Sequence, residues 1–292
     1  MPKLGIIGGS GLYHMEGLKN SQWVKIDTPF GSPSDEFLCA NLSAMDIVFL
    51  PRHGRGHRLL PCELNNPANI YGMKKLGVDI IVSVSAVGSL KEDIKPLDIV
   101  IPDQYVDRTS QPRKATFFGN GISAHIAFAE PTCPILGKLL YEEAKLLGLP
   151  VKMTGTYLNM EGPAFSTRAE SNLYRSWGMD IIGMTNMPEA KCAREAEICY
   201  ATMAMVTDYD CWHESEGVSI DMIIQNLLKN VENAKTILKG IIPKLPKDRN
   251  CICANALKDA IATSPDAISK EVRDRLDIII GKYTRKSLRD NS

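Results

Sequence analysis

Short apolar runs bounded by glycine, proline and aspartate recur along the chain, and such runs are typical of buried strands. They start at residue 3 and at Asp46, Asp79, Asp98, Asp180 and Cys199. Two stretches with helical spacing, "PANIYGMKKLG" and "PILGKLLYEEAKLLG", lie between several of these runs. Because strands that alternate with helices build parallel sheets, the pattern predicts an α/β domain with a largely parallel sheet.

The clearest helical pattern begins near Ser219, a plausible N-cap, with Asp221 in the first turn. One face carries apolar residues at Ile220, Ile223, Ile224, Leu227, Leu228, Val231, Ala234 and Leu238. This spacing predicts an amphipathic helix that covers the sheet or a partner.

The C-terminal part has a different pattern. Pro243 to Asn250 is typical of a linker, and two helical stretches follow, the second with Ser264 as N-cap and Pro265 at the first helical position. We expect residues 1–245 to form the main domain, and residues 246–292 to be a linker and C-terminal helical extension of the same domain, packed as an appendage.

Charge and hydropathy exclude two classes of partner. The 292 residues carry 34 basic and 34 acidic side chains, without a basic block or an aromatic-basic stripe, so we expect no nucleic-acid partner. No run of 18 apolar residues occurs, and the N-terminus is too rich in glycine for a signal peptide, so we expect no membrane partner and a cytoplasmic location.

The chain has eight cysteines and five histidines, without a C-x-x-C pair or a zinc-ligand spacing. We therefore expect no metal site, and most of the cysteines should be small buried hydrophobic residues. Cys251 and Cys253 are the exception, since a C-x-C pair after a polar linker can form a strained redox-active bond.

Potential phosphate ligands follow several of the predicted strands. "GIIGGSGL" is not a dinucleotide fingerprint, because His14 stands at the third glycine position, but its glycines and Ser10 can wrap an anion or simply form a tight turn. "PRHGRGH" carries Arg52, whose planar fork suits phosphate, or else forms an exposed basic loop. Ser85, Ser89 and Thr185 add hydroxyls, which can bind a ligand or satisfy backbone groups.

Asp208 and Asp210 end the last predicted strand. On an extended strand, residues two apart face the same way, so the two carboxylates should point together while Tyr209 points away. Three roles remain open at this point: a metal bridge, an acid/base pair, or recognition of a purine base through hydrogen bonds.

Eight blocks of the sequence carry a family resemblance over about residues 4–245: "GIIGGSGLY", "PRHGRGHR", "SVSAVGSL", "IPDQYVDRT", "AEP", "EGPAFSTRAES", "IIGMTNMPEA" and "MVTDYDCW". In this order they resemble the methylthioadenosine phosphorylases of the purine nucleoside phosphorylase superfamily. The resemblance implies one domain around a twisted mixed sheet flanked by helices, assembled as a trimer or a dimer of trimers. It implies cleavage of 5'-methylthioadenosine by phosphate, a co-substrate, without a cofactor.

The resemblance also implies a set of site residues. Phosphate ligands would be Ser10, Arg52, His53, Ser85, Ala86 and Thr185. Substrate ligands would be Phe165, Met184, Asp208, Asp210, Ile220, Ile223, Ile224 and, from a neighbouring subunit, His125, with Ser166 and Ile220 contributing to specificity.

The aspartate pair fits this chemistry. Asp208 would be the general acid at purine N7, with a pKa raised by burial and by the charge of Asp210. Asp210 would accept a hydrogen bond from the 6-amino group, so a 6-oxopurine would lose about 1 to 3 kcal/mol.

The chain departs from the family pattern at Ala164, Asn66 and Pro67, which affects loop geometry and subunit contacts. The C-x-C tail and the positions of Cys133 and Cys199 resemble the disulfides of thermophilic members. The alternatives are a 6-oxopurine nucleoside or methylthioinosine phosphorylase, which typically has asparagine in place of the first aspartate, a metal-dependent glycosyltransferase, and a non-catalytic nucleoside-binding protein.

Overall fold

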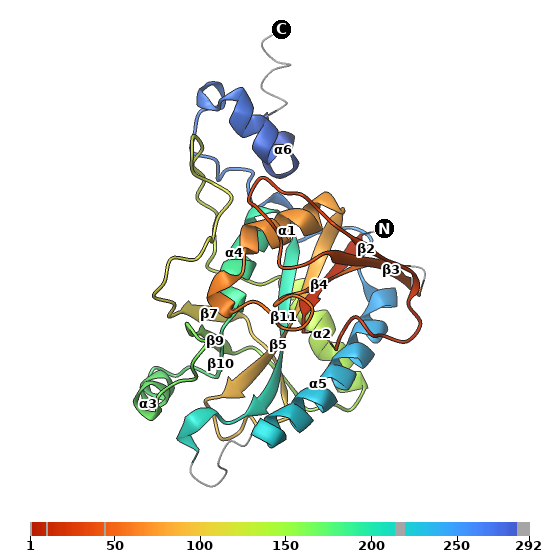
Figure 1. Ribbon diagram of the computed structural model, residues 1–292, viewed down its shortest axis with the longest axis vertical. Coiled ribbons are helices and arrows are strands. Elements are labelled where there is room, and N and C mark those ends of the chain that lie inside the picture. Colours follow the sequence, from red (N-terminus) through yellow and green to blue (C-terminus); the bar gives the residue numbers. More distant parts are fainter. Residues whose placement is uncertain (1, 10, 44, 214–219, 285–292) are drawn as a thin grey trace.

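A computed structural model describes residues 2–9, 11–43, 45–213 and 220–284. Its centre is an 11-stranded mixed sheet with helices on both faces (Figure 1). No helix within the described ranges is long and apolar enough to cross a membrane. The predicted α/β architecture with a largely parallel sheet is confirmed.

Four parallel strands form the middle of the sheet, in the order β4 (Met45–Pro51), β1 (Lys3–Gly8), β5 (Val78–Ser89) and β11 (Cys199–Asp208). They coincide with four of the predicted apolar runs. Their side chains are almost all buried because helices cover both faces, which is why these strands have continuous rather than alternating apolar patterns.

The sheet divides into two arms at the long strand β5. Its C-terminal end pairs with β10 (Ile181–Gly183) in antiparallel orientation, and β9 (Thr156–Asn159) and β7 (Gln104–Asp107) follow in parallel. On the other side, β11 pairs with β6 (Ile99–Ile101), which pairs with β8 (Val151–Met153). The branch brings segments far apart in sequence to the C-terminal half of β5.

The other end of the sheet is an antiparallel edge. The strands β2 (Lys19–Val24) and β3 (Phe37–Leu42) extend the sheet beyond β4. β2 is largely exposed, as expected for an edge strand, whereas β3 is mostly buried.

Helices α1 (Asn66–Lys75) and α4 (Asn186–Glu195) cover one face of the sheet, and α2 (Pro134–Leu146) and α5 (Ile220–Ile241) cover the other (Figure 1). The shorter α3 (Arg168–Ser176) lies near β10 and has a capping box in which Thr167 and Glu170 bond reciprocally. Short 3-10 turns complete the connections: η1 (Pro61–Glu63), η2 (Asp210–Trp212) and η3 (Ile242–Lys244).

The predicted long helix is α5, although its expected N-cap, Ser219, lies outside the described residues. Only the C-terminal half of the predicted apolar face is buried: Ala234 and Leu238 are fully covered, whereas Leu228 is 64% exposed. The N-terminal half of α5 therefore presents apolar side chains at the surface of this chain.

The C-terminal segment packs against the helices that cover the sheet. Leu257, Leu276 and Ile280 are completely buried in the same apolar cluster as α1 and α4. The first predicted helical stretch forms only η4 (Ile252–Asn255), because the chain bends there against β11 instead of continuing as a helix.

The second predicted start, at Ser264 and Pro265, marks the short turn η5 (Pro265–Ala267), while α6 (Lys270–Thr284) begins later. Ser269 Oγ accepts the N–H of Val272 at 3.3 Å and so caps α6.

The cysteine pairs expected from the family resemblance are not disulfides in this structure. All eight cysteines lie in the described ranges as free thiols. The close pair is Cys199 and Cys251, with sulfurs 3.2 Å apart, because the segment after the linker returns to the first residue of β11. Cys251 and Cys253, and likewise Cys133 and Cys199, are free thiols here, and both pairings stay predictions.

Candidate active site

The carboxyl ends of the central strands meet at one edge of the sheet. Gly8 at the end of β1 stands beside Pro51 at the end of β4, and the N–H of Arg52 donates to the Gly8 carbonyl at 2.9 Å. Asp208 at the end of β11 stands beside Gly88 of β5. This edge is where open α/β sheets bind ligands.

Arg52 is buried rather than part of an exposed basic loop, with 3% of its surface accessible. Its Nε and Nη2 pair with the two carboxylate oxygens of Glu189 at 3.0 and 3.2 Å, and Nη2 also donates to Ser83 Oγ at 2.6 Å. Nη1 makes a single hydrogen bond within the described residues, to the Val84 carbonyl at 2.9 Å, so one of its two N–H groups is available for a ligand.

Glu189 is the centre of a buried polar network that sequence reasoning missed. Its Oε1 accepts from the hydroxyls of Ser83 at 2.6 Å and Tyr200 at 2.9 Å as well as from Arg52. The side-chain amide of Asn186 joins the same group through Tyr200 at 2.9 Å. The network holds Arg52 rigidly, because breaking any bond leaves a buried group unpaired. The only sequence signal is a charged residue in the otherwise small and apolar run "NMPEA".

His53 has its tautomer set by a backbone contact. Its Nδ1 lies 2.8 Å from the Leu59 carbonyl and must donate there, since a carbonyl only accepts, which leaves Nε2 as an acceptor. Burial and the adjacent Arg52 charge lower its pKa to about 4, so the ring is neutral near pH 7. The ring stacks on His57 at 4.5 Å.

Ser85 and Thr185 both lie near the hydroxyl of Tyr157. The Tyr157 hydroxyl lies 3.3 Å from Ser85 Oγ, and Thr185 is among the groups close enough to influence its pKa. Burial raises the pKa of Tyr157, which keeps this hydroxyl neutral. The neighbouring Ala86 is exposed. Tyr157 is a second positioning residue that sequence reasoning missed.

Asp208 and Asp210 are held together, but not by strand alternation as the sequence predicts. β11 ends at Asp208, and Asp210 has φ +56° at the start of η2, so the alternation stops between them. The N–H of Asp210 instead donates to Asp208 Oδ1 at 2.8 Å, and Thr207 Oγ1 donates to Asp208 Oδ2 at 2.7 Å. This turn, not the pleat, joins the two carboxylates.

Asp210 has an unusual environment for a carboxylate. It is 7% exposed, and its Oδ2 is buried without a hydrogen-bond partner among the described residues. Burial raises the pKa of Asp210, and the charge of Asp208 adds to the effect. A buried acceptor without a donor costs about 1 to 3 kcal/mol, and a ligand N–H placed there would recover that energy.

The other predicted substrate residues lie around this edge in different states of exposure. Ser166 is buried, and its carbonyl accepts from the Cys211 thiol at 3.3 Å, which ties its loop to the turn that carries Asp210. Met184 is half-buried, with its carbonyl bonded to Arg113 Nη1 at 2.8 Å, while Phe165 is 73% exposed. Arg113 was not identified from the sequence.

Five predicted residues either make none of these contacts or lie outside the described residues. Ile223 is half-buried and Ile224 is 48% exposed at the start of α5, and the Ile220 side chain lies outside the described residues, as does Ser10. The backbone N–H of His125 bonds to the Ala260 carbonyl at 2.8 Å, which anchors it to the C-terminal segment. Their roles stay predictions.

The sequence model of the phosphorylase superfamily matches residues 3–243 of this chain. The chain belongs to that superfamily.

A relative from Geobacter sulfurreducens, an S-methyl-5'-thioadenosine phosphorylase, is 59% identical over 96% of this chain and 98% of its own length. The crystal structure of a methylthioadenosine phosphorylase from an Antarctic soil metagenomic library has a TM-score of 0.90 and 49% identity, over 95% of this chain and 98% of that one. A methylthioadenosine phosphorylase from Schistosoma mansoni, in complex with tubercidin, has a TM-score of 0.80 and 33% identity, over 88% and 96% of the two chains.

Proposed function

We propose that this superfamily member cleaves 5'-methylthioadenosine with inorganic phosphate to give adenine and 5-methylthioribose 1-phosphate. The observation that carries the proposal is 59% identity, over nearly the whole of both chains, to a relative named for this substrate. Phosphate is a co-substrate, and the reaction needs no cofactor.

Phosphate binds at the ends of β1, β4 and β5, through Ser10, Arg52, His53, Ser85, the backbone of Ala86 and Thr185. Support comes from the second N–H on Arg52 Nη1, which has no partner among the described residues, and from Tyr157, whose hydroxyl lies 3.3 Å from Ser85 Oγ. Because His53 is neutral and its Nε2 is an acceptor, it takes a hydrogen bond from a protonated phosphate oxygen or from a sugar hydroxyl.

The adenine base binds at Asp208 and Asp210. The unpaired Oδ2 of Asp210 accepts from the 6-amino group, which an adenine has and a 6-oxopurine lacks. Ser85 and Gly88 are three residues apart on β5, about 10 Å along an extended strand, which leaves room for the ribose between the phosphate and the base.

Asp208 acts as the general acid that protonates N7 as the glycosidic bond breaks. The reaction passes through an oxocarbenium-like sugar, so the site must neutralise the leaving purine while the phosphate anion stabilises the cation. Asp208 and Asp210 can share the necessary proton, because two negative charges side by side in a buried site are unfavourable.

The methylthio group packs against Ile220, Ile223 and Ile224, with specificity shared by Ser166. The partial exposure of Ile223 and Ile224 in a single chain supports a wall completed by a second subunit, which would supply His125 in a trimer or a dimer of trimers. Leu276 packs in the same apolar cluster as α1 and α4. This shared core supports the assignment of residues 1–245 and 246–292 to one domain. A cytoplasmic location completes the proposal.

The test measures release of free base from 5'-methylthioadenosine and from inosine, each with and without phosphate, with EDTA present. Phosphate-dependent release of adenine, with inosine left intact, would support the proposal. Hypoxanthine release alone would favour a 6-oxopurine nucleoside phosphorylase and contradict the role of Asp210. Base release without phosphate would mean hydrolysis and overturn the reaction.

The role of Asp210 can be separated from phosphate binding with the variant Asp210→Ala. We expect kcat/KM for 5'-methylthioadenosine to fall by about 10- to 100-fold or more, with little change in the KM for phosphate. Asp221→Ala, which removes an exposed carboxylate of α5, is the control and should change neither. A collapse of phosphate affinity in Asp210→Ala would contradict the assignment.

A further inference from the structure

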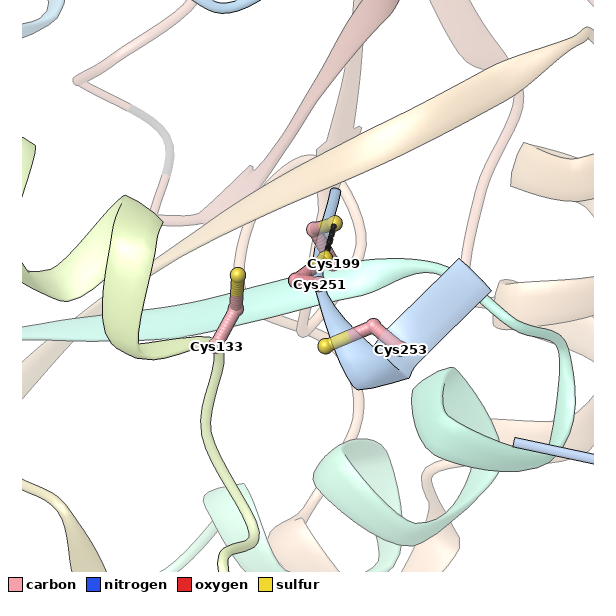
Figure 2. A group of neighbouring side chains, drawn as sticks. All are labelled: Cys133, Cys199, Cys251 and Cys253. Carbon is pink, nitrogen blue, oxygen red and sulfur yellow. Dashed lines mark hydrogen bonds between the residues drawn. The ribbon is translucent and has the colours of Figure 1, made fainter. Parts of the chain in front are cut away.

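Four cysteines converge at the N-terminal end of β11 (Figure 2). Cys133 immediately precedes α2, Cys199 is the first residue of β11, and Cys251 and Cys253 flank the start of η4. Their four sulfurs all lie within 4.8 Å of one another. Within the described ranges, no other group of three or more cysteine, histidine or acidic side chains has this arrangement.

The spacing of the sulfurs suits a tetrahedral metal better than disulfides. Zinc binds thiolates at about 2.3 Å, so the sulfurs of a four-cysteine site are about 3.8 Å apart. Here all four sulfurs lie within 4.8 Å of one another, and the close pair, Cys199 and Cys251, is 3.2 Å apart, so small side-chain shifts would reach this spacing. A disulfide would require about 2.05 Å and would leave two separate pairs instead of one group of four.

The surroundings provide what a metal site needs beyond its ligands. Cys133 is the residue immediately before the 13-residue helix α2, so its thiol lies near the positive N-terminal end of that helix. The positive end of a helix stabilises a thiolate.

A route by which an ion can reach the four sulfurs and a nearby positive charge are also present. Cys133, Cys199 and Cys253 are buried, whereas Cys251 is partly exposed and lines a small pocket with Leu245, Pro246 and Arg249. The pocket is an entry path for an ion, and the Arg249 guanidinium adds positive charge beside a ligand set that carries a net negative charge once bound.

We propose that Cys133, Cys199, Cys251 and Cys253 together bind one zinc ion as a structural site. Binding replaces each sulfur–hydrogen bond by a sulfur–zinc bond and releases the thiol protons to solvent, without oxidation of any group. Tetrahedral sets of four sulfurs hold zinc or iron, and zinc is the choice that needs no redox partner.

The bound zinc would crosslink three segments that are remote from one another in the sequence. It connects the C-terminal segment, through Cys251 and Cys253, to the start of β11 and to α2. Cys199 and Asp208 occupy opposite ends of the ten-residue strand β11, about 30 Å apart at the usual rise of a strand. The zinc therefore stabilises the fold and takes no part in the reaction.

This inference differs from the expectation of no metal site. Sequence spacing could not reveal it, because Cys133 and Cys199 are each isolated in the sequence, and a C-x-C pair lacks the two-residue spacing of common zinc motifs. Only the fold brings three segments together.

The test measures the metal content of the full-length protein, purified in reducing buffer without chelator, by elemental mass spectrometry. We expect one zinc per chain in the wild type, and at least a tenfold loss of bound zinc in Cys251→Ser and in Cys253→Ser. Cys39→Ser and Cys62→Ser, which change cysteines that are also partly exposed but outside the group, are the controls and should keep the zinc.

A second measurement on the wild type remains decisive if the serine variants fail to fold. Titration with a thiol-specific mercurial, followed by a colorimetric zinc indicator, should release the zinc as four thiols react. Full-length protein without metal, or with intramolecular disulfides among these four residues, would overturn the proposal. Stoichiometric iron would overturn the choice of zinc, and zinc retained by Cys251→Ser and Cys253→Ser would place the metal elsewhere.

Discussion

The two ends of β11 carry different functional groups, carboxylates at one end and thiols at the other. At its C-terminal end, Asp208 and Asp210 lie at the open edge of the sheet, and Asp210 Oδ2 is buried with no hydrogen-bond partner in the part of the chain that the structure describes. At its N-terminal end, Cys199 joins three other thiols in a largely enclosed group. The first end leaves a polar atom for a ligand, whereas the second is surrounded by its own chain.

This difference separates two ways of building a site. The aspartates are neighbours in sequence, and a local turn sets their geometry. The cysteines come from three segments, so their geometry depends on the packing of α2, β11 and the C-terminal segment. Between the two ends, Tyr200 of β11 belongs to the network around Glu189 and Arg52, which connects the strand to α4. Changes at one end should therefore affect activity, and changes at the other should affect stability.

The largest expected effect is at the carboxylate end. Asp208→Asn removes the proposed proton donor, so we expect kcat on 5'-methylthioadenosine to fall by about 10²- to 10⁴-fold. Bound zinc and the melting temperature should stay at wild-type values, because the strand and its thiol end are unchanged. Asp266→Asn, at an exposed aspartate, is the control for both measurements. A lowered melting temperature in Asp208→Asn alone would break the separation between the two ends.

A large stability effect is expected between the two ends. Glu189→Ala leaves the buried guanidinium of Arg52 without its ion pair, so the free energy of unfolding should fall by about 3 to 5 kcal/mol. Glu142→Ala breaks the exposed pair with Lys138 on α2 and should cost less than about 1 kcal/mol. Urea unfolding of both variants checks the difference, and equal losses would contradict the structural role given to Glu189.

A buried carboxyl of α4, near the thiol end, should give the stability a pH dependence. Glu195 accepts from the N–H of Phe117 at 2.8 Å and from Thr116 Oγ1 at 2.7 Å, but burial dominates and raises its pKa from 4.5 to about 7. Because folding favours the protonated form, its stabilising contribution is complete below pH 4.5 and is lost as the pH rises through 7. The loss is on the order of 3 kcal/mol.

The variant Glu195→Gln tests this pH dependence. Urea unfolding at several pH values between 4.5 and 8 should show a smaller decrease in stability for Glu195→Gln than for the wild type. Parallel curves for the two proteins would show that Glu195 does not titrate in this window.

The smallest effect on activity is expected from removing zinc. Treatment of the full-length protein with a strong chelator should leave the initial rate of adenine release at 25 °C unchanged and lower the melting temperature. Restoring zinc should restore the melting temperature. A rate that falls in proportion to the zinc removed would show that the thiol end serves catalysis, and the contrast between the two ends would be wrong.

The central strands could be predicted from sequence because strands buried on both faces need continuous apolar runs, and glycine, proline and aspartate mark their ends. The phosphate-edge residues followed from the same logic, since parallel strands end at one edge. The burial of Arg52 and its ion pair could not be predicted, because its partner Glu189 is 137 positions away in the sequence. Tyr157 was missed for a similar reason, because it acts only through contacts with other strands.

Local patterns also failed where the backbone left its regular path. The alternation expected for Asp208 and Asp210 ended at the positive φ of Asp210, although the carboxylates stayed together through a backbone hydrogen bond. In α5 the periodicity was correct, but it could not show that Ile224 and Leu228 remain exposed in a single chain. Periodicity identifies an apolar face and does not identify what covers it.

The sequence by itself determined the fold class, the superfamily and the pairing of two carboxylates, because each depends on residues close together in the chain. Tertiary structure alone decided which groups are buried and which groups they contact. Arg52 pairs with Glu189, Asp210 Oδ2 has no partner among the described residues, and Cys199 lies beside three other thiols. The physical reason is that burial and hydrogen bonding depend on distances in space, and those distances arise from packing between segments remote in sequence.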